Sequence, residues 1–241
     1  MQMIYAHRGA SGYAPENTLR AFQKAADLRA HGVELDVQLT RDGQVVVIHD
    51  ETIDRVTGKH GFVADYTYEE LQQFPIVHAV NADGTDRIPL LRDVLKLLKQ
   101  HGLKLNIELK NSDNLYPGME EKCIRLVDEC GMTADTMYSS FNHNSLLKVK
   151  ALLPQAKCGI LYDCRMIMPW DYAKHHGLDA LHTEFHEMLL DESFVRQAHA
   201  CGVEVNPWTV NKKEDLQAVI AAGADRIITN YPDIALQMLK G

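Results

Sequence analysis

The chain has 241 residues, enough for one domain with a large core, since single-domain barrels commonly have about 200 to 250 residues. Apolar residues make up 46% and charged residues 24% of the sequence, which excludes a disordered or low-complexity chain. The formal net charge of -8 argues against nucleic acid as the main partner, because a phosphate backbone binds to a basic surface.

The start of the chain and its cysteines are typical of a cytoplasmic protein, which is the compartment we expect. The first residues lack the basic region and apolar run of a signal peptide, and no apolar segment reaches the ~20 residues that span a membrane. We therefore expect no stable membrane association, and we leave the choice between monomer and homo-oligomer open. The cysteines are odd in number and show no CxxC spacing, which predicts buried thiols at Cys123, Cys130, Cys158, Cys164 and Cys201.

The first part of the chain predicts two strands with a helix between them. Residues 3–7 (MIYAH) and 32–37 (GVELDV) are short, largely apolar runs of the kind that form strands. Residues 17–31 have the apolar spacing of a helix, which we expect to stop at Gly32. The run QVVVIHD, residues 44–50, follows a turn and is predicted to pair with or extend the second strand as a hairpin.

Residues 51–89 interrupt this alternation of strand and helix. The segment contains TGKHGFVADYTYEELQQFP and the turn-rich NADGTDRIP, without a clear βα unit. We interpret it as a small insertion after the second strand that covers the active-site mouth, because long structured loops at the top of a barrel often cover a binding site. Surface decoration is the alternative.

A regular βα alternation begins with the helical pattern of residues 90–102 and continues to the end of the chain. The six strands predicted there are KLNIELK (104–110), TMYSSF (136–141), KCGILY (157–162), DALHTE (179–184), GVEVNPW (202–208) and DRIITN (225–230). With the two earlier strands they make eight units, the number that closes a (β/α)8 TIM barrel. We therefore predict an α/β fold with a single domain over residues 1–241, and an open doubly wound sheet is the alternative.

Two acidic residues share one face of the second predicted strand. Side chains alternate along a strand, so Glu34 and Asp36 project from the face opposite Val33, Leu35 and Val37. The apolar face packs on the surrounding helices, which directs the two acids to the barrel interior at its C-terminal mouth. Two unpaired buried carboxylates are costly there, and a cation would remove that cost.

The strand NIELK repeats this design. Glu108 and Lys110 share a face opposite Ile107 and Leu109, and bring a third carboxylate and a lysine to the same mouth. Three carboxylates without cysteines or a close histidine pair favour Mg²⁺ or Ca²⁺ over a structural zinc ion. A salt-bridged rim without metal is the alternative for each acid pair taken alone.

Two histidines and an arginine also lie at predicted strand ends. His7, Arg8 and Gly9 follow the first strand, and His49 ends the run VVVIH. The arginine offers a bidentate fork to phosphoryl oxygens, and histidine titrates near neutral pH, as a catalytic acid or base must. A lone histidine is usually structural or solvated, but two beside acidic residues favour a catalytic site for a phosphate compound.

These residues together resemble the glycerophosphodiester phosphodiesterase family. The motifs that carry the resemblance follow one another in the family's order: HRGASGYAPENT, GVELDVQLTRDGQVVVIHDETIDRVT, RIPLLRDVL, NIELK, SSFN, PWTVN and DRIITNYP. They cover essentially the whole chain. Single motifs such as SSF would mean little, whereas the ordered set is highly specific.

The resemblance implies a role for each candidate residue. It implies one divalent cation, Mg²⁺ or Ca²⁺, on Glu34, Asp36 and Glu108, and an acid/base pair of His7 and His49. Arg8 and Lys110 would bind the phosphate. Trp208 would line the substrate pocket, with Phe141 at a comparable strand end; core packing is the alternative for both. Pro15, Glu16 and Asn17 match the PENT turn, where we expect scaffold residues and a helix cap at Asn17.

The function implied is hydrolysis of small glycerophosphodiesters, such as glycerophosphocholine or glycerophosphoethanolamine, to sn-glycerol 3-phosphate and an alcohol. Water or the neighbouring glycerol hydroxyl could attack, and both routes use the same residues. One alternative is a lysophospholipase D-like lipid phosphodiesterase, but no segment is basic and amphipathic enough to dock on a membrane. The other is a non-catalytic phosphate-binding module, which the presence of both histidines and all three acids disfavours.

Overall fold

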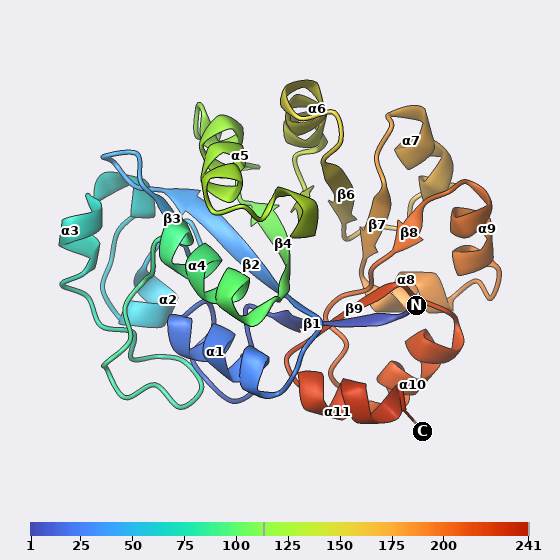
Figure 1. Ribbon diagram of the computed structural model, residues 1–241, viewed down its shortest axis with the longest axis horizontal. Helices are drawn as coiled ribbons and strands as arrows, with labels where there is room; N and C mark the ends of the chain where they lie inside the picture. Colours follow the sequence, from blue (N-terminus) through green and yellow to red (C-terminus); the bar gives the residue numbers. More distant parts are fainter. Residues whose placement is uncertain (113, 241) are drawn as a thin grey trace.

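Parallel strands form a nearly closed barrel with helices outside it (Figure 1). The computed structural model describes residues 1–112 and 114–240. Within these residues the barrel strands, in sheet order, are β8 (Glu204–Val205), β7 (Ala180–Thr183), β6 (Lys157–Tyr162), β5 (Thr136–Ser140), β4 (Lys104–Leu109), β2 (Gly32–Leu39), β1 (Met3–His7) and β9 (Arg226–Thr229). Each neighbouring pair along this path is parallel, as predicted.

Backbone hydrogen bonds join the two ends of this sheet. The Asp225 amide donates to the Val205 carbonyl at 2.8 Å, and the Ile228 amide donates to the Pro207 carbonyl at 3.0 Å. A third bond runs from the Val210 amide to the Ile228 carbonyl at 2.9 Å. The chain after β8 therefore closes the barrel against β9, and the alternative of an open doubly wound sheet is wrong.

The helices pack their apolar faces on the outside of the barrel (Figure 1). They are α1 (Leu19–Asp27), α4 (Leu91–His101), α5 (Met119–Glu129), α6 (His143–Leu152), α7 (Pro169–His175), α8 (Phe185–Leu189), α9 (Phe194–Ala200), α10 (Lys213–Ala221) and α11 (Pro232–Met238). Val33, Leu35 and Val37 of β2 belong to the same buried core, so the alternation predicted for this strand is confirmed. None of the helices described is long and apolar enough to cross a membrane.

The first helix is shorter than predicted. It ends at Asp27, because Arg29 adopts a left-handed conformation with φ of 62° that a helix cannot continue through. Gly32 instead begins β2, and its role is close packing between strands. A β-carbon there would lie 2.8 Å from the Lys104 carbonyl oxygen and from the ring of Tyr5.

The segment after β2 contains a hairpin strand and short helices. Strand β3 (Val45–Val47) pairs antiparallel with β2, which confirms the predicted hairpin. It is followed by α2 (Asp54–Thr57), the 3-10 helix η1 (Val63–Asp65) and α3 (Tyr68–Leu71), all at the side of the barrel in Figure 1. A second buried cluster, separate from the main core, holds this segment on β3: Val46, Ile48, Ile53, Val56, Val63, Leu71, Ile76 and Ile88.

The expectation of buried thiols holds for only part of the set. Cys123 and Cys158 are buried, whereas Cys130 and Cys201 are half-buried and Cys164 is exposed. Cys164 lies in the loop between β6 and α7, and Cys130 and Cys201 are the residues at which α5 and α9 end. Composition alone does not distinguish such surface positions from the core.

The separate second cluster predicts local rather than global destabilisation. Leu71→Ala should remove ~2–5 kcal/mol from the packing of residues 51–89. Hydrogen exchange should rise in that segment, with little change in the unfolding midpoint of the barrel. Leu95→Ala, an equal truncation in the main core, is the matched control and should lower the global midpoint. Equal midpoint losses in both variants would show that the segment unfolds together with the barrel.

Candidate active site

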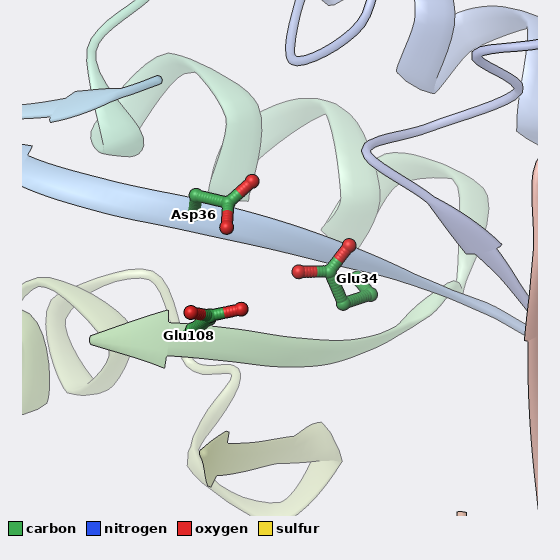
Figure 2. A group of neighbouring side chains, drawn as sticks. All are labelled: Glu34, Asp36 and Glu108. Atoms are coloured by element: carbon green, nitrogen blue, oxygen red, sulfur yellow. The ribbon is translucent and has the colours of Figure 1, made fainter. Parts of the chain in front are cut away.

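Three buried carboxylates face one another inside the barrel. The parallel register of β2 and β4 places Asp36 opposite Glu108, and Glu34 opposite Asn106. The alternation of side chains brings Glu34, Asp36 and Glu108 to the inner side, where Figure 2 shows their carboxylates together. Ligand oxygens of the three lie within 4.8 Å of one another, and each residue is at most 9% exposed.

The three carboxyl groups perturb one another's protonation. Burial raises the pKa of Glu34 well above its ordinary value, and the charges of Asp36 and Glu108 raise it further. Burial and the Asp36 charge likewise raise the pKa of Glu108, although Lys110 opposes them. Burial would also raise the pKa of Asp36, but the charges of Arg8 and Lys110, with His49 and a hydrogen bond from Asn17, together outweigh it and the net shift is downward. Only part of the negative charge is therefore balanced by the protein itself.

A divalent cation fits this arrangement. Among the residues that the structure describes, Oδ1 of Asp36 is buried and has no hydrogen-bond partner. A buried oxygen of this kind normally requires a partner. The donors are carboxylate oxygens alone, which suits a hard ion such as Mg²⁺ or Ca²⁺.

The turn after β1 positions Arg8 against this cluster. Arg8 has a left-handed backbone with φ of 53°, and its amide donates to Oε2 of Glu34 at 3.0 Å. Its Nε lies 3.3 Å from Oδ2 of Asp36, and its NH1 donates to Glu16 at 2.8 Å. Gly9 follows with φ of 76°, where a β-carbon would lie 2.6 Å from the backbone of Ala21. The sequence Arg-Gly therefore permits a close turn, which directs both the backbone amide and the guanidinium of Arg8 to the carboxylate cluster.

The two histidines have different hydrogen-bond partners. His7 Nδ1 lies 2.7 Å from Oδ1 of Asn230, while its Nε2 lies 3.9 Å from Oε2 of Glu34. Burial, with the Arg8 charge beside it, lowers the pKa of His7 to about 4. His49 Nδ1 instead lies 2.6 Å from a carboxylate oxygen of Asp50. His7 is thus neutral near pH 7, whereas the Nδ1 of His49 is held by a carboxylate.

Lys110 lies between a carboxylate and a histidine. Its Nζ donates to Oε1 of Glu108 at 3.0 Å and lies 3.4 Å from Nε2 of His49. Burial would lower its pKa, but the charges of Glu108 and Asp36 outweigh burial and raise it. Lys110 is therefore a cation held beside the acidic cluster, as its spacing in NIELK suggested.

Sequence reasoning assigned Asn17 the wrong role. The cap of α1 is Thr18, whose hydroxyl accepts from the Ala21 amide at 3.1 Å. Asn17 has φ of 57° and donates from Nδ2 to Oδ2 of Asp36 at 2.8 Å. Threonine is also a preferred capping residue, and Thr18 follows Asn17 directly. Its presence in the sequence was the signal that the cap could lie one residue later.

An arginine of the segment 51–89 joins two parts of the site, and sequence reasoning missed it. Arg55 of α2 donates to Asp50, from Nε to Oδ2 at 2.7 Å, and to Glu16, from NH2 to Oε1 at 2.7 Å. Partial burial would raise the pKa of Asp50, but hydrogen bonds from His49 and Arg55 hold it well below its ordinary value. Arg55 thereby links the partner of His49 to the partner of Arg8. A single arginine in a loop carries no sequence pattern that would reveal this.

Most of the predicted site residues line one cavity of about 270 Å³. Its wall residues include His7, Arg8, Glu34, His49, Glu108, Phe141 and Trp208. Phe141 and Trp208 pack edge to face with ring centroids 6.0 Å apart, and the Trp208 indole donates to the His182 carbonyl at 2.8 Å. Asp36 lies 3.3 Å from the wall residue Arg8, and Lys110 lines an adjoining hollow.

The raised carboxyl pKa values predict a pH-dependent response to metal. A carboxyl with a raised folded-state pKa stabilises fully below its unfolded pKa of ~4.3, and this contribution is lost as pH rises through the folded pKa. Deprotonated Glu34 and Glu108 therefore weaken the metal-free fold. Mg²⁺ or Ca²⁺ should raise the melting temperature more at about pH 8 than at about pH 5, because protons compete with the ion.

Differential scanning calorimetry with and without the ion, at both pH values, measures this response. Glu34→Gln removes one charged donor and should abolish most of the increase. An increase of equal size at both pH values, or in both proteins, would place the binding ion elsewhere.

Comparison with known proteins agrees with this geometry. Residues 7–234 match the model of the glycerophosphoryl diester phosphodiesterase family. The chain is 41% identical to a glycerophosphodiester phosphodiesterase of Caldanaerobacter subterraneus subsp. tengcongensis, covering 99% of this chain and 98% of the relative. It is 38% identical to a glycerophosphodiester phosphodiesterase of Bacillus altitudinis, again over 99% of this chain and 98% of the relative.

A solved structure extends the likeness to three dimensions. It is a phosphodiesterase of Oleispira antarctica in complex with the product sn-glycerol-3-phosphate. The TM-score is 0.91 at 26% identity, covering 100% of this chain and 98% of that one. With barrel, acidic cluster and family match in agreement, this chain belongs to the glycerophosphoryl diester phosphodiesterase family and is an enzyme of that class.

Proposed function

We propose that this enzyme hydrolyses small glycerophosphodiesters, such as glycerophosphocholine or glycerophosphoethanolamine, to sn-glycerol 3-phosphate and an alcohol. The observation that carries the proposal is the group of three buried carboxylates within 4.8 Å, with His7 and His49 in the same cavity. The Oleispira antarctica phosphodiesterase, which is similar over 98% of its length, is in complex with the product sn-glycerol-3-phosphate.

In this proposal Glu34, Asp36 and Glu108 hold one divalent cation, Mg²⁺ or Ca²⁺. When bound, such an ion would polarise a phosphoryl oxygen and lower the pKa of an attacking hydroxyl. Arg8 and Lys110 bind the phosphate and offset the negative charge that grows on its oxygens during transfer. Both of these side chains already lie beside the carboxylate cluster, so they do not have to move in from solvent when the phosphate binds.

The two histidines carry the proton transfers. His7 donates from Nδ1 to Asn230, which leaves the lone pair of Nε2 directed to the side of Glu34. It is therefore suited to accept a proton from the nucleophile. His49, whose Nδ1 lies 2.6 Å from the Asp50 carboxylate, is oriented by this contact and passes a proton from Nε2 to the departing alcohol.

The remaining residues define the surroundings of the reaction. Trp208 and Phe141 exclude water from one wall of the cavity. Residues 51–89 cover one side of the mouth as part of a single catalytic domain over residues 1–241, and Arg55 connects them to the site. We place the enzyme in the cytoplasm.

Product analysis with glycerophosphocholine tests this function. Free choline and sn-glycerol 3-phosphate should form in equal amounts, stop with a chelator, and resume with Mg²⁺ or Ca²⁺. Phosphocholine and glycerol as products would show cleavage of the other ester bond. Binding without turnover would identify a phosphate-binding module. Turnover of lysophospholipids alone would favour the lipid phosphodiesterase.

The assigned histidine roles predict different responses to leaving-group chemistry. His49→Ala should lower kcat/KM on glycerophosphocholine by ~10²- to 10⁴-fold, because an alkoxide leaves poorly without a proton. It should recover largely on the p-nitrophenyl ester of glycerol phosphate, since p-nitrophenolate disperses its own charge. His7→Ala should be slow on both substrates, because activation of the nucleophile is still needed.

Steady-state kinetics of both variants on both substrates measure this difference. His101→Ala, at the exposed end of α4, is the control and should behave like the wild type. Rescue of His7→Ala instead would reverse the two roles, and rescue of neither would contradict a histidine general acid.

A further inference from the structure

A second hollow of about 210 Å³ adjoins the catalytic cavity at the barrel mouth. It is lined by residues that follow the ends of β3, β4, β5 and β6: Glu51, Lys110, Ser112, Phe141 and Asp163. Glu108 and Phe141 line both spaces. A diester whose phosphorus lies at the carboxylate cluster therefore has one substituent in the inner cavity and can extend the other into this outer hollow.

The outer hollow carries a net negative charge, because the carboxylates of Glu51, Glu108 and Asp163 line it together with one lysine. Its lysine, Lys110, is paired with Glu108 at 3.0 Å. Glu51 is half-buried and Asp163 is exposed, and neither carboxylate forms an ion pair or hydrogen bond with the part of the chain that the structure describes. Unpaired carboxylates at the wall of a hollow attract a cation.

The floor of the inner cavity is polar but uncharged. It is formed by Asn106, Ser139 and His182, which are buried and polar. Burial, with the Arg226 charge nearby, lowers the pKa of His182 to about 3, so this side chain is neutral. The carboxylates nearest to this floor, Glu34 and Glu108, are the proposed ligands of the divalent cation, so a cationic group on the floor would compete with that ion for them, whereas hydroxyl groups can form hydrogen bonds with the polar side chains. The glycerol arm fits the inner cavity and a charged arm fits the outer hollow.

An aromatic ring lines both spaces and is partly exposed. Phe141 is 37% exposed, although it packs on Trp208. The ammonium of Lys110 lies 6.0 Å from the centroid of the Phe141 ring. Cations are attracted to aromatic faces at such distances, and quaternary ammonium groups commonly bind in this way.

We propose that Glu51, Asp163 and Phe141 form a subsite for the cationic headgroup of the leaving alcohol, a choline- or ethanolamine-like group. The two carboxylates supply charge and Phe141 supplies an aromatic face. The enzyme should therefore prefer glycerophosphodiesters with a cationic headgroup over neutral ones. This inference rests on the proposed function, because it assigns the position of one arm of that substrate.

The test compares two substrates that differ only in charge. Glycerophosphocholine is matched with its isostere from 3,3-dimethylbutanol, in which carbon replaces the quaternary nitrogen. With Mg²⁺ or Ca²⁺ present, kcat/KM should be ~10-fold or more higher for the choline ester, and the preference should shrink as ionic strength rises.

Single substitutions show which residues cause the preference for the cationic headgroup. Glu51→Gln and Asp163→Asn should each lower the preference ~3- to 10-fold, mainly through KM for the choline ester, because each removes one charge from a partly solvated site. Phe141→Leu keeps apolar contact but loses the aromatic face, so it should also reduce the ratio. Asp27→Asn, at the exposed end of α1 where the strands begin, removes the same charge far from the mouth and should keep the wild-type ratio.

The outcomes separate the two proposals. Cleavage of both diesters with a preference that these three variants reduce would support the headgroup subsite. Equal rates for both diesters in the wild type, or a preference that the variants do not alter, would overturn the subsite and leave the proposed function intact. Cleavage of neither diester with metal present would overturn the proposed function itself, and the subsite with it.

Discussion

The repulsion among three carboxylates inside the barrel is the constraint on which the rest of the site depends. Burial makes each charged carboxylate costly and the neighbouring like charges add to that cost, so the pKa values of Glu34 and Glu108 are raised. The surrounding residues each offset part of it. Arg8 contributes an amide and a guanidinium, Asn17 an amide group, and Lys110 an ammonium. Residues that are far apart in the sequence thus contact the same three carboxylates at one end of the barrel, and each lowers the electrostatic cost of placing them there.

The sequence was sufficient for those parts of the site that follow from strand geometry. Alternation along β2 and β4 places Glu34, Asp36 and Glu108 on the inner side, and the parallel register then brings them together. The eight βα units predicted the barrel for a similar reason, because apolar periodicity reports burial directly. Local patterns of this kind need no knowledge of distant contacts.

Residues whose roles arise from long-range contacts were not predictable in this way. Arg55 acts through Asp50 and Glu16, which are 5 and 39 residues away in the chain. Asn230 holds His7 across 223 residues. Asn17 was misjudged because its local pattern suggests a cap, whereas its actual partner, Asp36, lies on the next strand. In each case the side chain is of a common polar type, and its hydrogen-bond partner is determined only by the closed barrel.

The attachment of Arg55 to both Asp50 and Glu16 has a consequence for heat resistance. Arg55 belongs to a segment held by its own small buried cluster, separate from the core that stabilises the barrel. Small clusters open more readily than a large core. If this segment loosens, Arg55 no longer holds Asp50, and His49 then loses the partner that orients its ring. The enzyme is therefore expected to lose its working geometry on warming while its circular dichroism still reports an intact barrel.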